Sequence, residues 1–259
     1  MIGYIRVGPT AIPLPYRGGL DTDSERPISF ITSLGGKRTA LLGPRVRREW
    51  SVSFDLMGAR ESAGLVSAAR SAGEVGWFPA DAVSGNLLSP QAQQWETAPS
   101  GATKAGVAAL PDGTFADSVS AAGVVQVGTS HGSYELVPLL AGSDVSVGGW
   151  GFGGLRLQGF WRDAAGVSMG SFASPISTHA GWGYRSHTMT PPAGAAGLQL
   201  SMSNGTAYAR PSVSWGSVPW DSPGRGCPRA VVHGLSESLS VISSAEAYGS
   251  VGVTITEVG

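Results

Sequence analysis

The chain of 259 residues contains a single cysteine, Cys227, and only four histidines. One cysteine excludes an internal disulfide and any metal cluster held by several thiolates. The four histidines are scattered and form no HExxH pattern, so the sequence predicts no histidine metal site. Calcium bound by backbone and carboxylate oxygens leaves little trace in a sequence, so a structural calcium ion stays open.

Charged residues make up only 14% of the chain, and the formal net charge is -1. This balance provides no basic field for nucleic acid or for an anionic membrane surface, so neither is expected as a partner. No apolar run approaches the roughly 18 residues of a membrane span, and the N-terminus has no run of signal-peptide length. We therefore expect a soluble product without membrane insertion.

Glycine and proline are abundant, with 39 and 17 residues, which suits short strands joined by turns better than helical bundles. The sequence therefore predicts a mainly β protein. Residues 86–220 hold 11 charged residues in 135 positions and 13 of the 21 aromatic residues, whereas the flanks hold 24 charged residues in 124 positions. We predict an inserted domain at 86–220 and one discontinuous domain made of residues 1–85 and 221–259.

The N-terminal flank opens with a segment rich in proline and glycine and then shows a strict alternation at 49–56. Trp50 and Phe54 share one face of this stretch, and polar residues occupy the other, which predicts a half-buried strand. At 59–72, apolar residues recur at helical spacing without proline, which predicts one short helix.

The C-terminal flank shows two alternating strands, at 231–242 and 250–258. Two strands alone make no core, so we expect them to pair with the N-terminal flank. In the middle section, short apolar stretches separated by turn residues favour a β-sandwich or jelly roll, and Asn204-Gly205 predicts a two-residue hairpin. Strands are expected there at 135–140, 144–147, 155–161, 167–172, 184–190, 197–202 and 207–215.

Motifs for catalysis are present only in incomplete form. Two GxSxG patterns, at 128–132 and 166–170, lack the strand-turn-helix that a nucleophilic serine needs. The GxGxxG pattern at 149–154 is followed by a strand pattern, and no helix follows to bind a phosphate. The acidic residues of the middle section lie mostly at turns or strand starts, which disfavours a carboxylate pair for glycoside cleavage. We therefore predict a protein that is not an enzyme and uses no cofactor.

The stretch LRLQGFW at 155–161 places two large aromatic residues side by side. Side chains alternate along a strand, so Trp161 and the leucines share one face, while Arg156, Gln158 and Phe160 share the other. A planar cation, an amide and a ring together suit a sugar, whose CH groups stack on rings while its hydroxyls take hydrogen bonds. The alternative is a polar outer face with one exposed phenylalanine. With two residues that alternate similarly at 184–190, the candidate sugar-binding set is Arg156, Gln158, Phe160, Arg185 and His187.

Five of the 17 basic residues fall between positions 37 and 48. They suit either a solvated strand or loop, or a surface between subunits where arginines pair with carboxylates. The candidates for an oligomer interface are Arg45, Arg47 and Arg48.

Several longer motifs run through the chain. In the middle section these are NLLSP at 86–90, WE at 95–96, LVPLLAGSDVSVGGW, LRLQGFWRDAAG, GWGYRSHTMTPPAGAAGLQLSM and ARPSVSW; in the flanks they are REWSV at 48–52, WFP at 77–79 and GCPRAVVHGL at 226–235. The middle section resembles a carbohydrate-binding-module-like jelly roll. The flanks resemble minor tail proteins of siphophages that infect actinobacteria, and among these the distal-tail-like proteins.

The resemblance implies a tail-tube-like β-sandwich domain with one short helix, which forms a hexamer or trimer ring at the distal tail tip or baseplate of a virion assembled in the host cytoplasm. The implied partners are further copies of the chain, the tail tube, the tape measure and the baseplate hub. The inserted jelly roll would bind host cell-wall polysaccharide or only decorate the tail. The alternatives are a dedicated carbohydrate-binding adsorption protein and, less favoured, a cell-wall glycan hydrolase.

Overall fold

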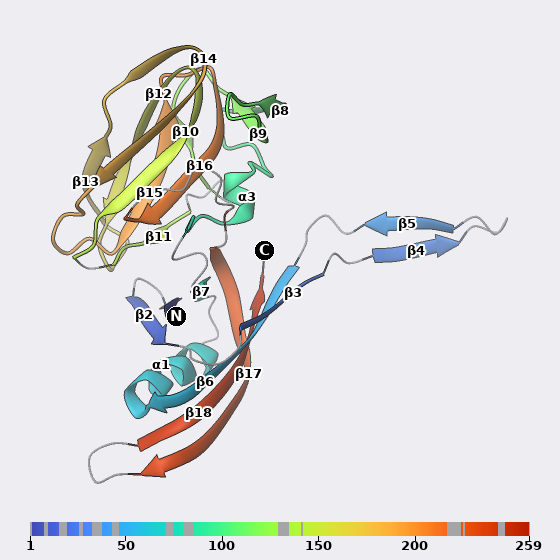
Figure 1. The fold of residues 1–259 in the computed structure, drawn as a ribbon, viewed down its shortest axis with the longest axis vertical. Helices are drawn as coiled ribbons and strands as arrows, with labels where there is room; N and C mark the ends of the chain where they lie inside the picture. Colours follow the sequence, from blue (N-terminus) through green and yellow to red (C-terminus); the bar gives the residue numbers. More distant parts are fainter. Residues whose placement is uncertain are drawn as a thin grey trace. The chain divides into compact units, whose positions relative to one another are not determined.

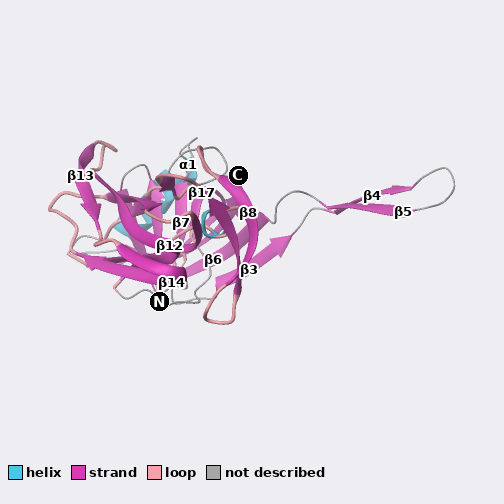
Figure 2. Cartoon of the chain, turned by 90° about the horizontal axis from the view of Figure 1, so that it is seen from above, coloured by secondary structure: helices cyan, strands magenta, loops and turns pink. Residues whose placement is uncertain are grey.

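The computed structural model is mainly β, with antiparallel sheets and the two helices α1 and α3 among the described residues, which confirms the predicted fold class (Figures 1 and 2). The chain divides into two compact units: unit 1 holds Leu14–Val75 and Arg229–Gly259, and unit 2 holds Ile2–Pro13 and Gly76–Pro228. The predicted boundary at 220–221 lies outside the described residues, so the division at 85–86 and 220–221 stays a prediction. The structure describes residues 2–7, 10–15, 20–25, 28–32, 38–42, 47–70, 75–79, 85–128, 135–140, 142–216, 224, 226–242 and 247–258.

Unit 1 is built on an antiparallel run of four strands. Strand β6 (Arg47–Gly58) contains the stretch at 49–56 for which alternation was predicted. The alternation is confirmed as far as side chains are described: Trp50, Val52 and Phe54 are buried, and the polar residues between them are exposed. β6 pairs with β18 on one side and with β3 on the other, so the N-terminal and C-terminal flanks do share a sheet. The order is β17 (Cys227–Ile242), β18 (Ala247–Glu257), β6 (Arg47–Gly58) and β3 (Leu20–Glu25).

Helix α1 (Ala59–Arg70) follows β6 directly and confirms the predicted helix, whose last two predicted positions lie outside the described residues. Its Leu65 is buried, as the helical spacing requires. β4 (Ile28–Thr32) and β5 (Arg38–Leu42) pair with each other and form a sheet of their own.

Two further N-terminal strands and β7 form a run with the order β2, β1, β7. These are β1 (Ile2–Val7), β2 (Thr10–Pro15) and β7 (Val75–Phe78). The sequence did not predict β2 because it contains Pro13 and Pro15, and proline lacks an N–H group and usually argues against a strand. β2 lies at the edge of its sheet, where a missing donor is tolerated.

Unit 2 is organised around β12 (Val145–Arg162), a strand of 18 residues. The sequence predicted two separate strands with a glycine-rich link, and this prediction is wrong because the link itself is extended and paired. The first half of β12 pairs with β14 (Ser177–Met189) and β16 (Ala207–Trp215), and the second half with β13 (Ser168–Ala173) and β15 (Gly197–Ser203).

The predicted Asn204-Gly205 hairpin is also wrong, because β15 and β16 pair with successive halves of β12 and not with each other. Asn204 does adopt the left-handed conformation that turn residues use, with φ 67°. The backbone segments around Gly154 and Asn204 approach so closely that a Cβ atom on Gly154 would lie 2.5 Å from the Asn204 carbonyl oxygen. The buried Tyr208 hydroxyl holds the turn by donating to the Gly205 carbonyl at 2.7 Å, and burial raises its pKa.

The core of unit 2 lies on one side of β12 along its whole length. Val147, Leu155, Leu157 and Trp161, all odd-numbered, belong to a single apolar cluster. β15 adds Leu198, Leu200 and Met202 to it. Since side chains alternate, the even-numbered residues of β12 face away from this core.

The remaining elements of unit 2 are short. β8 and β9 form a hairpin that the sequence did not predict, and Ala108 and Ala116 of this hairpin pack against a small apolar cluster that contains Trp150 of β12. These short elements are α3 (Pro90–Gln93), β8 (Thr103–Ala109), β9 (Phe115–Ser120), β10 (Val125–Gln126) and β11 (Val137–Pro138).

Candidate functional site

The second half of β12 has the two faces that its sequence predicted. Leu155 and Leu157 are fully buried and Trp161 is 6% exposed, whereas Phe160 is 40% exposed. Arg156 and Gln158 are partly exposed. The structure therefore brings Arg156, Gln158 and Phe160 together on the outer side of the sheet.

Neighbouring strands extend this surface with further polar groups. The register places Ser203 opposite Arg156, Ser201 opposite Gln158 and Gln199 opposite Phe160. Directly opposed residues of antiparallel strands share a face, so hydroxyl and amide groups lie beside the three residues of β12. We call this surface the Phe160 face, and its members are Gln126, Arg156, Gln158, Phe160, Arg162, Gln199, Ser201 and Ser203.

Polar contacts fix the groups around the Phe160 ring. The guanidinium carbon of Arg162 lies 5.8 Å from the ring centroid, and its Nε donates to Gln199 Oε1 at 2.9 Å. Such an arrangement limits the rotamer freedom of both long side chains before any ligand arrives. An exposed ring bordered by fixed donors and acceptors is suited to a sugar ring, which presents CH groups on its face and hydroxyls at its edge.

Two buried polar atoms on this face have no hydrogen-bond partner within the described part of the chain. They are Nε of Arg156 and Oγ of Ser203, which belong to directly opposed residues. Ser203 is only 6% exposed. Buried donors and acceptors are usually satisfied, so these two atoms are polar groups that the described residues leave unpaired, directly beneath the exposed part of the face.

The signal for the additional residues was present in the sequence of β15, GLQLSMS. Leu198, Leu200 and Met202 are buried in the core, and Gln199, Ser201 and Ser203 alternate with them. Period-2 alternation predicts such a polar face once the strand is recognised. What the sequence could not supply was the pairing of β15 with β12.

Arg185 and His187 lie on the other side of the sheet. In the register of β14 with β12, Arg185 is opposite Gly149 and His187 is opposite Val147. Val147 belongs to the core, so both residues share the core-facing side near the edge of the sheet. The structure therefore does not bring Arg185 and His187 together with the Phe160 face, and a single site of all five candidates is not supported by this geometry.

The arginine candidates for an oligomer interface fall largely outside what the structure describes. Arg45 lies outside the described residues, and the side chain of Arg47 is likewise not described. Arg48 is largely buried in its own chain: Nε and Nη2 donate to the two carboxylate oxygens of Glu257 at 2.9 and 3.1 Å. Its guanidinium also lies 4.9 Å from the Trp50 ring centroid. A role of these arginines between subunits stays a prediction.

Glu135 is a buried carboxylate that has a structural task. It is 2% exposed and accepts hydrogen bonds from the backbone N–H of Ser89 at 2.7 Å and from the Ser89 hydroxyl at 2.6 Å. The same hydroxyl accepts from Ala92 N at the start of α3. Burial lowers the pKa of nearby Arg6, whereas the charge of Glu135 opposes that shift. The carboxylate therefore holds the start of α3 within unit 2.

Among the described residues, the motifs for nucleophiles and phosphates fall within strands or directly before one. Ser168 is the exposed first residue of β13, and the 128–132 pattern lies partly outside the described residues. Residues 149–154 lie within β12, as part of a strand. Among the side chains that the structure describes, no group of three or more His, Cys, Asp or Glu residues could hold a metal ion. None of the described helices has the length and apolar character required to cross a bilayer.

Comparison with known proteins adds no relative: no protein-family model matches the chain, and the curated proteins contain no match.

Proposed function

We propose that the chain is a structural minor tail protein of a phage virion, which forms an oligomeric ring at the distal tail tip and binds host surface glycans through the Phe160 face. The observation that carries the glycan part is the exposed Phe160 ring beside the Arg162 guanidinium and the Gln199 amide, on a face that also presents Gln158 and Arg156. Residues on a sheet are held more rigidly than residues on loops, so less conformational entropy is lost on binding.

The ring part of the proposal is supported by a hairpin in unit 1 that pairs with no other strand among the described residues. β4 and β5 form a hairpin of two five-residue strands, and within the described residues they pair only with each other. A two-stranded hairpin is at best marginally stable alone in water. Six of its ten residues are apolar, so a second copy of the chain would supply the surface on which the hairpin packs.

The Phe160 face carries two arginines and no carboxylate among its members, so it would accept neutral or acidic polysaccharides. Binding of purified host cell-wall polysaccharide to the full chain, measured by isothermal titration calorimetry, tests this part. Phe160→Ala should weaken binding about tenfold, because stacking on one aromatic ring contributes on the order of 1 kcal/mol or more.

Val231→Ala is the matched control, because Val231 is 39% exposed, close to the 40% of Phe160, and lies in unit 1. This variant should bind as the unmodified chain does. Equal binding by the Phe160→Ala and Val231→Ala variants would remove the Phe160 face from the proposal.

The ring is tested separately by native mass spectrometry of the purified full chain. A trimer or hexamer is expected at tens of micromolar. A strictly monomeric chain that still binds glycan would contradict the ring and favour a dedicated adsorption protein.

A further inference from the structure

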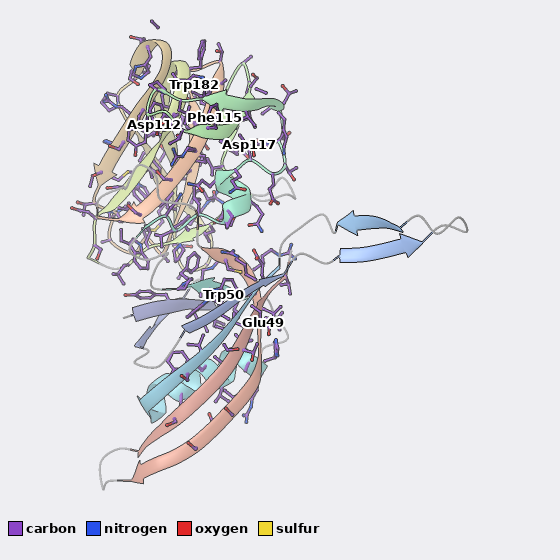
Figure 3. The ribbon with its side chains drawn as sticks, turned by 45° about the vertical axis from the view of Figure 1, so that its right-hand side comes forward. Glu49, Trp50, Asp112, Phe115, Asp117 and Trp182 are labelled. Carbon is purple, nitrogen blue, oxygen red and sulfur yellow. The ribbon has the colours of Figure 1, made fainter. Side chains whose placement is uncertain are left out.

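A concave surface, separate from the Phe160 face, lies in unit 2 between the end of α3, the β8–β9 hairpin and β16. The pocket has a volume of about 370 Å³, which lies within the range of small-ligand sites. Figure 3 labels Asp112, Phe115 and Asp117 on this hairpin and its turn. The lining residues are Gln93, Gln94, Thr114, Phe115, Ala116, Asp117 and Arg210.

Arg210 owes its position to an irregularity in β16. Ala209 pairs with Trp150 and Ser212 with Gly148, so two residues of β16 stand opposite the single residue Gly149. This is a β-bulge, and bulges redirect side chains. Arg210 takes the left-handed conformation, with φ 46°, immediately before a proline. A residue other than glycine in this conformation is strained, and such strain is concentrated at ligand sites.

The turn between β8 and β9 holds the redirected guanidinium. Arg210 Nη1 donates to Asp112 Oδ2 at 3.2 Å and to Thr114 Oγ1 at 2.8 Å. Asp112 in turn accepts from the Thr114 hydroxyl at 2.6 Å and from the Thr114 N–H at 3.0 Å. The charge of Arg210 is thereby offset, and its orientation is set before a ligand binds.

Other groups at the pocket are not engaged. Within the described part of the chain, Nε and Nη2 of Arg210 and the side chains of Gln94 and Asp117 make no hydrogen bond. Phe115 is 74% exposed, an unusual position for a large ring on a monomer surface. The pocket thus presents a ring, a fixed guanidinium edge, an amide and a carboxylate.

We infer that this pocket is a second saccharide site, distinct from the Phe160 face, and that it takes one neutral sugar unit. The ring of Phe115 stacks on the CH face of the sugar, and the Asp117 carboxylate accepts from its hydroxyls. Arg210 and Gln94 donate to the sugar oxygens. The inference rests on the proposed glycan-binding role for its class of ligand, but not on the ring or on the Phe160 face.

Charge determines which sugars the pocket takes. Asp112 offsets Arg210, so the uncompensated charge at the lining is that of Asp117, which repels uronates and phosphates. The same arrangement disfavours Asp112 as the general acid of a hydrolase. A general acid needs a raised pKa, whereas hydrogen bonds from Thr114 lower the pKa of Asp112.

The test uses saturation-transfer NMR on the full chain carrying Phe160→Ala, so that binding at the Phe160 face is weakened. The probes are glucose, galactose, mannose, arabinose and N-acetylglucosamine, with glucuronate as the anionic probe. At least one neutral sugar should bind, and glucuronate should bind more weakly.

Adding Phe115→Ala or Asp117→Asn should weaken binding about tenfold, because each change removes a stacking or charge-assisted contact. Val107→Ala, at a 68% exposed apolar residue of the same hairpin, should leave binding unchanged.

Three results would overturn the inference: no neutral sugar binds the Phe160→Ala chain, the two pocket variants bind as tightly as the Val107→Ala control, or glucuronate binds as tightly as glucose. If the first result appears while the unmodified chain still binds cell-wall polysaccharide, the pocket fails and the Phe160 face stands. If the unmodified chain binds no glycan at all, both proposals fail.

Discussion

Asn86 is 1% exposed and makes three side-chain hydrogen bonds, two of which connect the segment before α3 to β16. Its Oδ1 accepts from the backbone N–H groups of Leu88 and Val213, both at 3.1 Å, and its Nδ2 donates to the Pro211 carbonyl at 3.3 Å. Asn86→Ala removes the side-chain groups and leaves two buried N–H groups without an acceptor.

The expected loss follows from those two groups. Leaving a buried donor unsatisfied costs roughly 1 to 3 kcal/mol, so two donors together give about 2 to 6 kcal/mol. Folded domains are stable by about 5 to 15 kcal/mol, so the variant should lose a large fraction of the stability of unit 2. Entry of a water molecule into the space left by the amide would bring the loss toward the lower end of this range.

Urea denaturation followed by tryptophan fluorescence measures the loss, because Trp95, Trp161 and Trp215 all belong to unit 2. Hydrogen exchange shows where in the chain stability is lost: the peptide that contains Leu88 and the peptide that contains Val213 should both exchange faster than in the unmodified chain. Gln94→Ala is the control, since it removes an exposed amide and should change stability by less than about 0.5 kcal/mol. A loss below about 1 kcal/mol for Asn86→Ala, with unchanged exchange at both peptides, would refute the reasoning.

Three further predictions test the faces of β12 and the pocket. Trp161→Ala should cost about 3 to 5 kcal/mol in urea denaturation, whereas Phe160→Ala should cost less than about 1 kcal/mol because its ring is partly exposed; equal losses would contradict the assigned faces. Gly159→Ala should destabilise by more than about 1 kcal/mol, because its Cβ would overlap a backbone carbonyl of β15, and an unchanged urea midpoint would count against that close approach. Hydrogen bonds from Thr114 lower the pKa of Asp112 below 3.8, so its stabilisation is present above that pH and lost as the pH falls through the lowered value. The stability difference between the unmodified chain and Asp112→Asn should therefore be constant from pH 7 to pH 5 and shrink below pH 4, and a difference that does not depend on pH would exclude this contribution.

Alternation was enough to predict the strands with one buried face. β6 and the second half of β12 show strict period-2 patterns, and Phe54, Leu157 and Trp161 are buried as expected. The same alternation also predicts that Arg156, Gln158 and Phe160 share one outer face, where they do lie. Such patterns are local, because one strand carries the whole signal.

Features that depend on pairing between distant segments could not be predicted in this way. The β8 and β9 strands, TKAGVAA and FADSVS, are rich in small residues and show no clear apolar face. The position of Arg210 depends on the register of β16 against β12, and the side on which Arg185 lies depends on the register of β14. Register is set by the folded sheet, so neither could be read from a single segment.

β12 contributes to the surroundings of both proposed binding surfaces in unit 2. Its even-numbered residues stay outside the core along the whole strand, and they reach the Phe160 face at one end and Trp150, beneath the β8–β9 hairpin, at the other. Because both surfaces lie in unit 2, a variant that weakens the core of unit 2 should lose binding at both by unfolding, whereas Phe160→Ala and Phe115→Ala should each affect one surface alone. Binding that falls at one surface while stability is unchanged therefore identifies a ligand contact, and a parallel loss at both surfaces identifies a fold defect.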